Sequence, residues 1–314
     1  MSDSSLFPIF RFGGKKDGPA LLISAGVHGD EYLPMLAVQN LIRHFENNPD
    51  EADSLNGTLT LIPVVNGSAF ALGNRCGEDD KDLARTCPGV DDGTITEQVA
   101  AALSREIEAV DFYVDVHTGG TELCVFPLAG YVLHSDERIL EQQRNLARAF
   151  QLPFCWGTSS KLEGRSLSVA RDANVPAIYI EYYGSHREAS EATVGIGMDH
   201  PLVHGCLNVM RHLNLLPEEE STRISPEFVE DTRPDSGHMQ ICHPAPATGF
   251  YRARVKLGQR VGMGAPLARI TSPGSLESIE VQANRAGKVI VLRDYPRINK
   301  DDAIAVIAEQ YSGP

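Results

Sequence analysis

The chain has 314 residues, enough for one large hydrophobic core and a smaller second domain. Hydrophobic residues make up 42% of the sequence and charged residues 22%, as in an ordinary soluble globular protein. The formal net charge of −14 argues against nucleic acid or an anionic membrane as the main binding partner.

The N-terminal residues 1–8 lack both the basic and the apolar part of a targeting signal. No apolar run approaches the roughly 20 residues needed to cross a membrane. The six cysteines are scattered, without a Cys-x-x-Cys pair. We therefore expect reduced thiols and a cytoplasmic location.

The first strong element is an apolar run at residues 20–25, which predicts a buried strand, followed by a helical pattern over 31–47. His28 and Glu31 lie between the two, three positions apart. A pair of metal-ligand residues at such a turn is held rigidly and can be reached from a crevice. Because His-x-x-Glu also occurs often by chance, this segment alone leaves a purely structural role equally open.

Two polar residues follow the next predicted strand, at residues 57–65. Asn66 comes directly after it, where it can bind a ligand or simply cap a turn. Arg75 lies on a glycine-containing loop at residues 73–77, from which its side chain can reach a site. A surface position explains Arg75 equally well.

The strand predicted over residues 112–116 leads to a second histidine. Asp115 and His117 are two positions apart on it, so both side chains point to one face. Two strands that each lead to a histidine near a glycine suggest a shared site. Two histidines and a carboxylate are a common ligand set for catalytic zinc, which leaves a fourth position to water.

A third strand, predicted over residues 177–181, ends in Glu181 shortly before a glycine. A carboxylate at that position could accept a proton from a water molecule on the metal. The remaining predicted elements of this part are a strand at 123–126 and helices at 94–110, 136–150, 164–174 and 200–215. This alternation predicts an α/β domain with a mixed sheet covered by helices.

The stretch at residues 217–237 is charged and rich in turn-forming residues, so we expect a linker or a surface connection there. Beyond it the pattern changes to short strands separated by glycines, at residues 249–255, 258–262, 266–270, 287–292 and 303–307. This pattern predicts a small C-terminal all-β domain, shaped like a sandwich or barrel. The sequence thus divides into a catalytic domain at residues 1–238 and a β domain at 239–314.

Taken together, these motifs resemble the succinylglutamate desuccinylase/aspartoacylase family, whose members are zinc-dependent amide hydrolases related to the metallocarboxypeptidases. The resemblance rests on the order His28-x-x-Glu31, Asn66, Arg75, Asp82-x-x-Arg85, Asp115-x-His117 and Glu181. It implies a zinc-carboxypeptidase-like fold and a small N-acylated substrate, and the C-terminal β segment fits the second domain of that family.

Carried over to this chain, the resemblance implies one Zn²⁺ held by His28, Glu31 and His117. Glu181 would be the general base, and Arg75 the cation facing the scissile carbonyl. Three further roles follow from the same resemblance. Arg85 and Asn66 would bind the substrate, Asp82 would orient a ligand histidine, and Asp115 would support His117.

One position departs from the family pattern. The usual Asp-x-Asn-Arg run is here Asp82-Leu-Ala-Arg85, so Ala84 replaces an amide that normally helps to hold a substrate carboxylate. We expect either a weaker demand for that carboxylate or a compensating contact from another loop, such as one from Arg165. Two alternatives stay open, a carboxypeptidase-like peptidase and a non-catalytic binding protein on the same fold. The sequence leaves the oligomeric state unknown.

Overall fold

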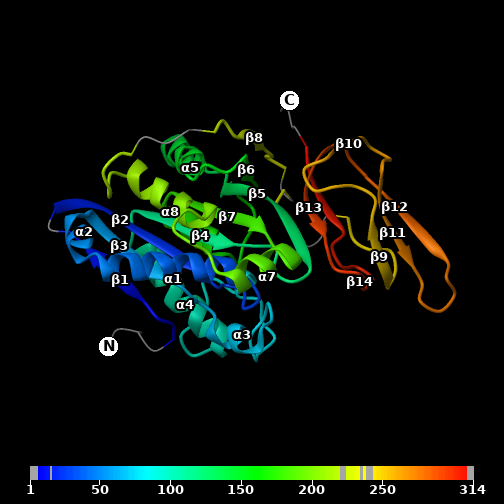
Figure 1. Cartoon of the computed structure of the whole chain (residues 1–314), viewed down its shortest axis with the longest axis horizontal. Coiled ribbons are helices and arrows are strands. Elements are labelled where there is room, and N and C mark those ends of the chain that lie inside the picture. The colour runs from blue at the N-terminus through cyan, green and yellow to red at the C-terminus, as the bar shows by residue number, and fades with distance from the viewer. Residues whose placement is uncertain (1–5, 15, 220–223, 234–235, 238–242, 310–314) are drawn as a thin grey trace.

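The computed structural model describes residues 6–14, 16–219, 224–233, 236–237 and 243–309 (Figure 1). An eleven-stranded mixed sheet forms its centre, in the order β1-β3-β2-β4-β7-β5-β13-β10. Strand β15 pairs with β13, and β6 lies between β5 and β8. The strands are β1 (Phe10–Gly13), β2 (Lys16–Ala25), β3 (Asn56–Ile62), β4 (Phe112–His117), β5 (Leu123–Val132), β6 (Phe154–Thr158), β7 (Ala177–Tyr183), β8 (Glu227–Glu230), β10 (Arg260–Val261), β13 (Gly287–Arg293) and β15 (Ala305–Ala308).

The middle of the sheet is parallel and buried on both faces. Leu21, Leu22 and Ile23 of β2 are all fully buried, which is why this strand is a continuous apolar run. Strand β4 pairs in parallel with both β2 and β7. The carboxyl ends of β2, β4 and β7 therefore meet at one edge, as the sequence predicts.

Helices cover both faces of the sheet (Figure 1). The core on one face contains residues of α1 (Tyr32–Asn47), α5 (Glu137–Ala149) and α8 (Pro201–His212). The core on the other face contains residues of α4 (Ile95–Glu108) and α6 (Ser166–Asp172). These five helices confirm the mixed α/β fold that the apolar periodicity predicts.

Several short elements were not predicted. They are α2 (Pro49–Ser54), α3 (Gly67–Leu72), the 3-10 helix η1 (Leu83–Arg85), α7 (Ser185–Val194), and strands β1, β6 and β12 (Ser278–Gln282). Each is too short or too polar to show a clear hydrophobic period. Within the described residues, no helix is both long and apolar enough to cross a bilayer.

The C-terminal region is all-β, as predicted, but it is divided between two sheets. Strands β9 (Gly249–Ala253), β11 (Pro266–Thr271), β12 and β14 (Arg297–Ile298) form a separate antiparallel sheet in the order β12-β11-β9-β14. Strand β13 instead joins the large sheet beside β5, where Val291 pairs with Val125. The predicted boundary between residues 238 and 239 lies outside the described residues and stays a prediction.

The segment at residues 217–237, expected to be a linker or a surface connection, contains a strand that was not predicted. Strand β8 pairs in parallel with β6, so that Phe154 lies opposite Glu227. Only Val229 of β8 is buried, so the sequence carries almost no apolar signal for it. The strand forms because its backbone pairs with that of β6.

The shared sheet makes the stability of the C-terminal region depend on the catalytic region. Ile290 of β13 is fully buried in one cluster with Val125 and Trp156. Ile290→Ala is therefore expected to lower the free energy of unfolding by about 2–5 kcal/mol. The single tryptophan, Trp156, allows the transition to be followed by fluorescence during urea unfolding.

The matched control is Ile279→Ala in β12, where the side chain is 45% exposed. This variant is expected to change stability by less than about 1 kcal/mol. If Ile290→Ala left the Trp156 transition where it is in the wild type, the two regions would be energetically independent and this inference would be wrong.

Candidate metal and catalytic site

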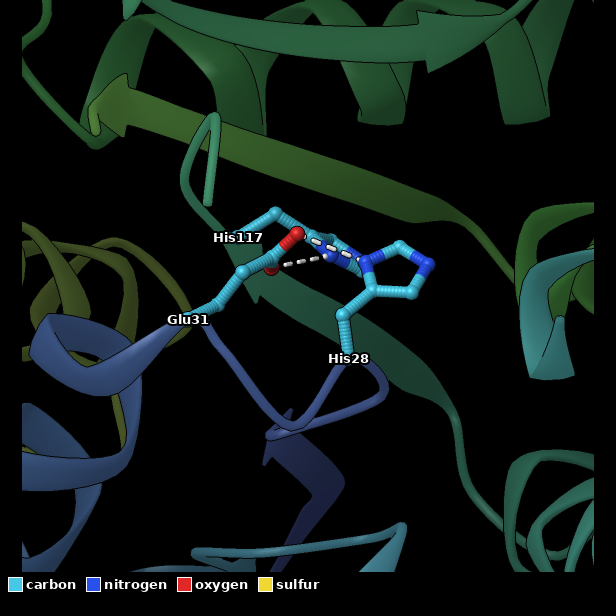
Figure 2. A group of neighbouring side chains, drawn as sticks. All are labelled: His28, Glu31 and His117. Atoms are coloured by element: carbon cyan, nitrogen blue, oxygen red, sulfur yellow. Dashed lines mark hydrogen bonds and ion pairs between the residues drawn. The ribbon is translucent and has the colours of Figure 1, made fainter. Parts of the chain in front are cut away.

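The site lies where β2 and β4 end and α1 begins (Figure 2). His28 follows the end of β2, Glu31 is the N-cap residue of α1, and His117 is the last residue of β4. The loop that carries His28 packs against the backbone of α3. A Cβ atom at Gly29 would come within 2.0 Å of the carbonyl carbon of Ala69, so only glycine fits there.

The Glu31 carboxylate is shared by the two histidines (Figure 2). Its Oε1 lies 2.6 Å from Nδ1 of His28, and its Oε2 lies 2.9 Å from Nδ1 of His117. Burial alone raises the pKa of Glu31, but the two histidines outweigh it and hold that pKa well below its usual range.

An aspartate lies behind each histidine ring. Nε2 of His28 is 3.3 Å from Oδ1 of Asp82, and Nε2 of His117 is 3.1 Å from Oδ2 of Asp115. An ionised carboxylate only accepts hydrogen bonds, so each Nε2 carries the proton and donates it. Each Nδ1 faces an oxygen of the ionised Glu31 in the same way and donates to it. In a metal-bound form each Nδ1 would give up its proton and offer its lone pair to the metal, while Nε2 stays bound to the aspartate, as in metal-ligating histidines.

This donor set fits a metal ion. One ligand atom from each of His28, Glu31 and His117 can be chosen so that all three lie within 4.8 Å of one another. Two imidazole nitrogens and one carboxylate oxygen suit Zn²⁺ and leave a coordination position open.

Asp115 is itself held firmly in place. Ser24 donates a hydrogen bond to its Oδ1 at 3.0 Å, and Ser166 donates one to its Oδ2 at 2.5 Å. Burial raises the pKa of Asp115, but His117 and these hydroxyl groups reverse the effect and lower it. The carboxylate therefore stays ionised and keeps the His117 ring in one orientation.

Arg75 reaches the site from its loop, as the sequence allows. Its Nε donates to Oδ2 of Asp82 at 3.0 Å, and its Nη1 is 3.5 Å from Nδ1 of His28. The guanidinium thus stands beside the histidines with a fixed direction, since one edge of the fork is bound to Asp82. A cation there can stabilise negative charge that develops on a substrate oxygen.

Glu181 is the register partner of His117 across the pair of strands β4 and β7. It is buried, and its Oε2 has no hydrogen-bond partner among the described residues. Burial is the largest influence on its pKa, which is raised to about 8. A buried, unpartnered carboxylate with a pKa near neutrality is suited to accept and return a proton.

A pocket of about 820 Å³, measured out to its open mouth, joins these groups. Its polar wall includes Arg75, Arg85 and Arg165, and Ala84 lies among them. Burial first, and then the neighbouring Arg85, lower the pKa of Arg165 to about 10. The positive charges of Arg85 and Arg165 repel each other, and an anionic group bound between them would offset that repulsion.

The apolar part of the pocket lining consists of Leu123, Val125, Val132, Leu167 and Val291. Val291 belongs to β13, so the C-terminal region closes one side of the pocket. The sequence did not predict this contribution, because it depends on the pairing of β13 with β5.

Asn66 is not among the residues that line the pocket. Its Oδ1 accepts the backbone N–H of Ala69 at 3.1 Å and so caps α3, which was the simpler of its two expected roles. Its substrate-binding role stays a prediction without a contact to support it.

Four polar pocket residues were given no role from the sequence, namely Thr118, Thr158, Ser166 and Tyr179. Tyr179 lies two positions before Glu181 on the same strand, so the strand period could have placed it on the same face. Thr118 directly follows a ligand histidine. Ser166 carries no signal in the sequence, since only the packing of α6 brings it to Asp115.

Comparison with known proteins places this geometry in a family. The family model of the succinylglutamate desuccinylase/aspartoacylase catalytic domain matches residues 17–195. The N-alpha-acetyl-L-2,4-diaminobutyric acid deacetylase of Halomonas elongata is 30% identical over 305 residues, which cover 93% of this chain and 83% of that protein.

Solved structures agree with this assignment. The product-bound ectoine utilization protein EutE (DoeB) of Ruegeria pomeroyi matches with a TM-score of 0.79 and 25% identity, over 96% of this chain and 88% of that one. A succinylglutamate desuccinylase of Silicibacter sp. TM1040 shares the fold with a TM-score of 0.79 and 24% identity, over 96% and 88% of the two chains. The chain therefore belongs to the succinylglutamate desuccinylase/aspartoacylase family, a family of deacylases.

Proposed function

We propose that this protein is a zinc-dependent deacylase that hydrolyses the amide bond of a small N-acylated amino acid. The observation that carries the proposal is the pair of histidine Nδ1 atoms on one carboxylate, with the unpartnered Glu181 facing the same pocket. The deacetylase from Halomonas elongata supports an N-acyl substrate, and an N-acetyl amino acid is the first compound to test.

His28, Glu31 and His117 would hold the metal. A bound Zn²⁺ supplies a Lewis acid that polarises a carbonyl oxygen and lowers the pKa of water toward about 7. The protein residues supply the rest of the chemistry. Glu181 accepts a proton from the attacking water and returns it to the departing amine nitrogen, while Arg75 faces the carbonyl oxygen as negative charge grows on it.

Arg85 and Arg165 would bind the carboxylate of the substrate. Ala84 offers no side-chain donor, so the structure supports the second of the two expectations for this position, a compensating contact from Arg165. The apolar wall suits a small acyl group or apolar side chain. Closure of that wall by Val291 favours a small substrate over a long peptide.

Purified protein is expected to contain about one zinc per chain, and His117→Ala to lose most of it. One of three ligands is removed, and the remaining two cannot complete the set. Elemental analysis of both proteins after dialysis checks this, with His134→Ala as the control because His134 lies outside the site. Equal zinc content in the wild type and His117→Ala would remove these residues from the metal site.

Glu181→Gln is expected to keep its zinc but to lose about 10²–10⁴-fold in kcat, the usual worth of general acid–base catalysis. The amide has nearly the same shape as the carboxylate but cannot accept the proton. Steady-state kinetics on the best N-acyl substrate measures the loss. Glu163→Gln is the control, since Glu163 is 71% exposed and pairs with Arg171 at the surface; a near wild-type kcat for Glu181→Gln would exclude Glu181 from the mechanism.

Arg165→Gln is expected to lower kcat/KM about 10–100-fold for an N-acyl amino acid, since a hydrogen bond to a charged group is worth about 1.5–3 kcal/mol. Its effect on the carboxamide analogue of the same substrate should be small, because that compound has no carboxylate. A panel of N-acetyl, N-succinyl and N-formyl amino acids identifies the substrate to use.

Arg138→Gln serves as the control for this experiment, because Arg138 is 90% exposed and pairs only with Asp136 at the surface. Equal losses of Arg165→Gln on carboxylate and carboxamide would show that Arg165 does not recognise the carboxylate. Ala84 would then mark a site that has lost this requirement.

A further inference from the structure

The helix that begins at the metal site lacks a cap from its own N-cap residue. Glu31 holds that position in α1, but its side chain is turned toward the two histidines and makes no capping hydrogen bond. The first backbone N–H groups of a helix have no partner within the helix and need one from outside. Because the Glu31 side chain faces the histidines, another residue must accept a hydrogen bond from these N–H groups.

Glu188 of α7 supplies this acceptor. Its Oε1 accepts the backbone N–H of Leu33 in the first turn of α1 at 2.9 Å. Glu188 is only 2% exposed and lies 155 positions from Leu33, so the contact depends wholly on the tertiary fold.

The second oxygen of Glu188 reaches the other side of the site. The hydroxyl group of Thr118 donates to Oε2 of Glu188 at 2.7 Å, and the backbone N–H of Thr118 donates to Oε2 of Glu31 at 3.2 Å. The Thr118 hydroxyl in turn accepts the N–H of Gly120 at 3.3 Å, which fixes the loop after His117. One carboxylate thus holds both the segment that carries Glu31 and the segment that carries His117.

The start of α7 is attached to the same loop. The backbone N–H of Ser185 donates to the carbonyl oxygen of Gly120 at 2.6 Å. Ser185 also has a positive φ of 54°, an uncommon conformation for a residue other than glycine. The helix that presents Glu188 is therefore fixed relative to the loop that Glu188 supports.

We propose that Glu188 is a positioning residue, which holds Glu31 and His117 in the arrangement that binds the metal. The proposal rests on the proposed function, because it assumes that these residues bind Zn²⁺. It assigns Glu188 no contact with substrate. It acts on the ligands through its hydrogen bonds with Leu33 and Thr118.

A purely stabilising role explains Glu188 less well. Burial raises the pKa of Glu188 to about 8, and the hydrogen bond from Thr118 only partly offsets this. A carboxyl group whose pKa is raised by folding costs stability as the pH rises above its unfolded value, because the folded state disfavours the charged form. A residue that costs stability at neutral pH, yet is fully enclosed at a site, is better explained by what it does for that site.

The test measures the zinc affinity of the folded protein by competition with a chromogenic chelator. Glu188→Ala is expected to weaken zinc binding about 10–100-fold, the usual loss when an outer partner of a metal ligand is removed. Glu188→Gln keeps an oxygen that can accept the Leu33 N–H, so it should recover most of the affinity. Glu191→Gln is the control on the same helix, where Glu191 pairs with Arg187 and His200.

A second variant makes the test independent of the folding of Glu188→Ala. Thr118→Val removes the hydroxyl donor but keeps the backbone N–H to Glu31, and it should weaken zinc binding to a lesser degree. Because both residues act through one hydrogen bond, the losses from Thr118→Val and Glu188→Ala should not add in full in the double variant.

Urea unfolding of the metal-free proteins, followed by Trp156 fluorescence, separates the two roles. If Glu188 is only structural, its variants will lose stability while zinc affinity stays within about twofold of wild type, and the proposal is overturned. Additive losses in the double variant would overturn it as well. If the wild type itself bound no zinc, the proposed function would fail first, and the two failures are therefore distinguishable.

Discussion

The shared carboxylate of Glu31 is the interaction on which the rest of the site depends. It joins the loop after β2 to the end of β4, and it brings the two histidine rings to 5.2 Å between their centroids. The charges and hydrogen bonds of the two histidines hold its pKa low despite burial. Asp82 and Asp115 extend the pattern outward, so each ring is bound on both of its nitrogens and neither is free to turn.

The buried histidines and carboxylates keep these contacts only if the surrounding backbone is rigid. The parallel strands β2, β4 and β7 supply a rigid frame, because their apolar cores on both faces fix where their carboxyl ends lie. The N-cap residue of α1 is the candidate ligand Glu31, whose side chain does not cap the helix, and Glu188 of α7 accepts the hydrogen bond from Leu33 instead. The helix cap that the local sequence does not provide thus comes from an element distant in sequence, as is typical of functional regions.

The C-terminal region is part of this frame and not an appended module. Strand β13 extends the catalytic sheet and contributes Val291 to the pocket wall, while the four-stranded sheet formed by β9, β11, β12 and β14 stands apart from it. The candidate catalytic groups and most of the pocket lining thus come from residues 28–181, and Val291 adds one apolar residue from the C-terminal region.

The sequence by itself determined the strands and helices that carry the site, because their apolar periods are long and unambiguous. It also placed the candidate metal ligands His28, Glu31 and His117 and the candidate base Glu181 close together, since each of them follows or ends such a strand. Only the tertiary structure decided how β13 joins the large sheet, how Ser166 reaches Asp115, and how Glu188 reaches α1. Those contacts join positions 51 to 170 residues apart, and they depend on packing that leaves no periodic trace in the chain.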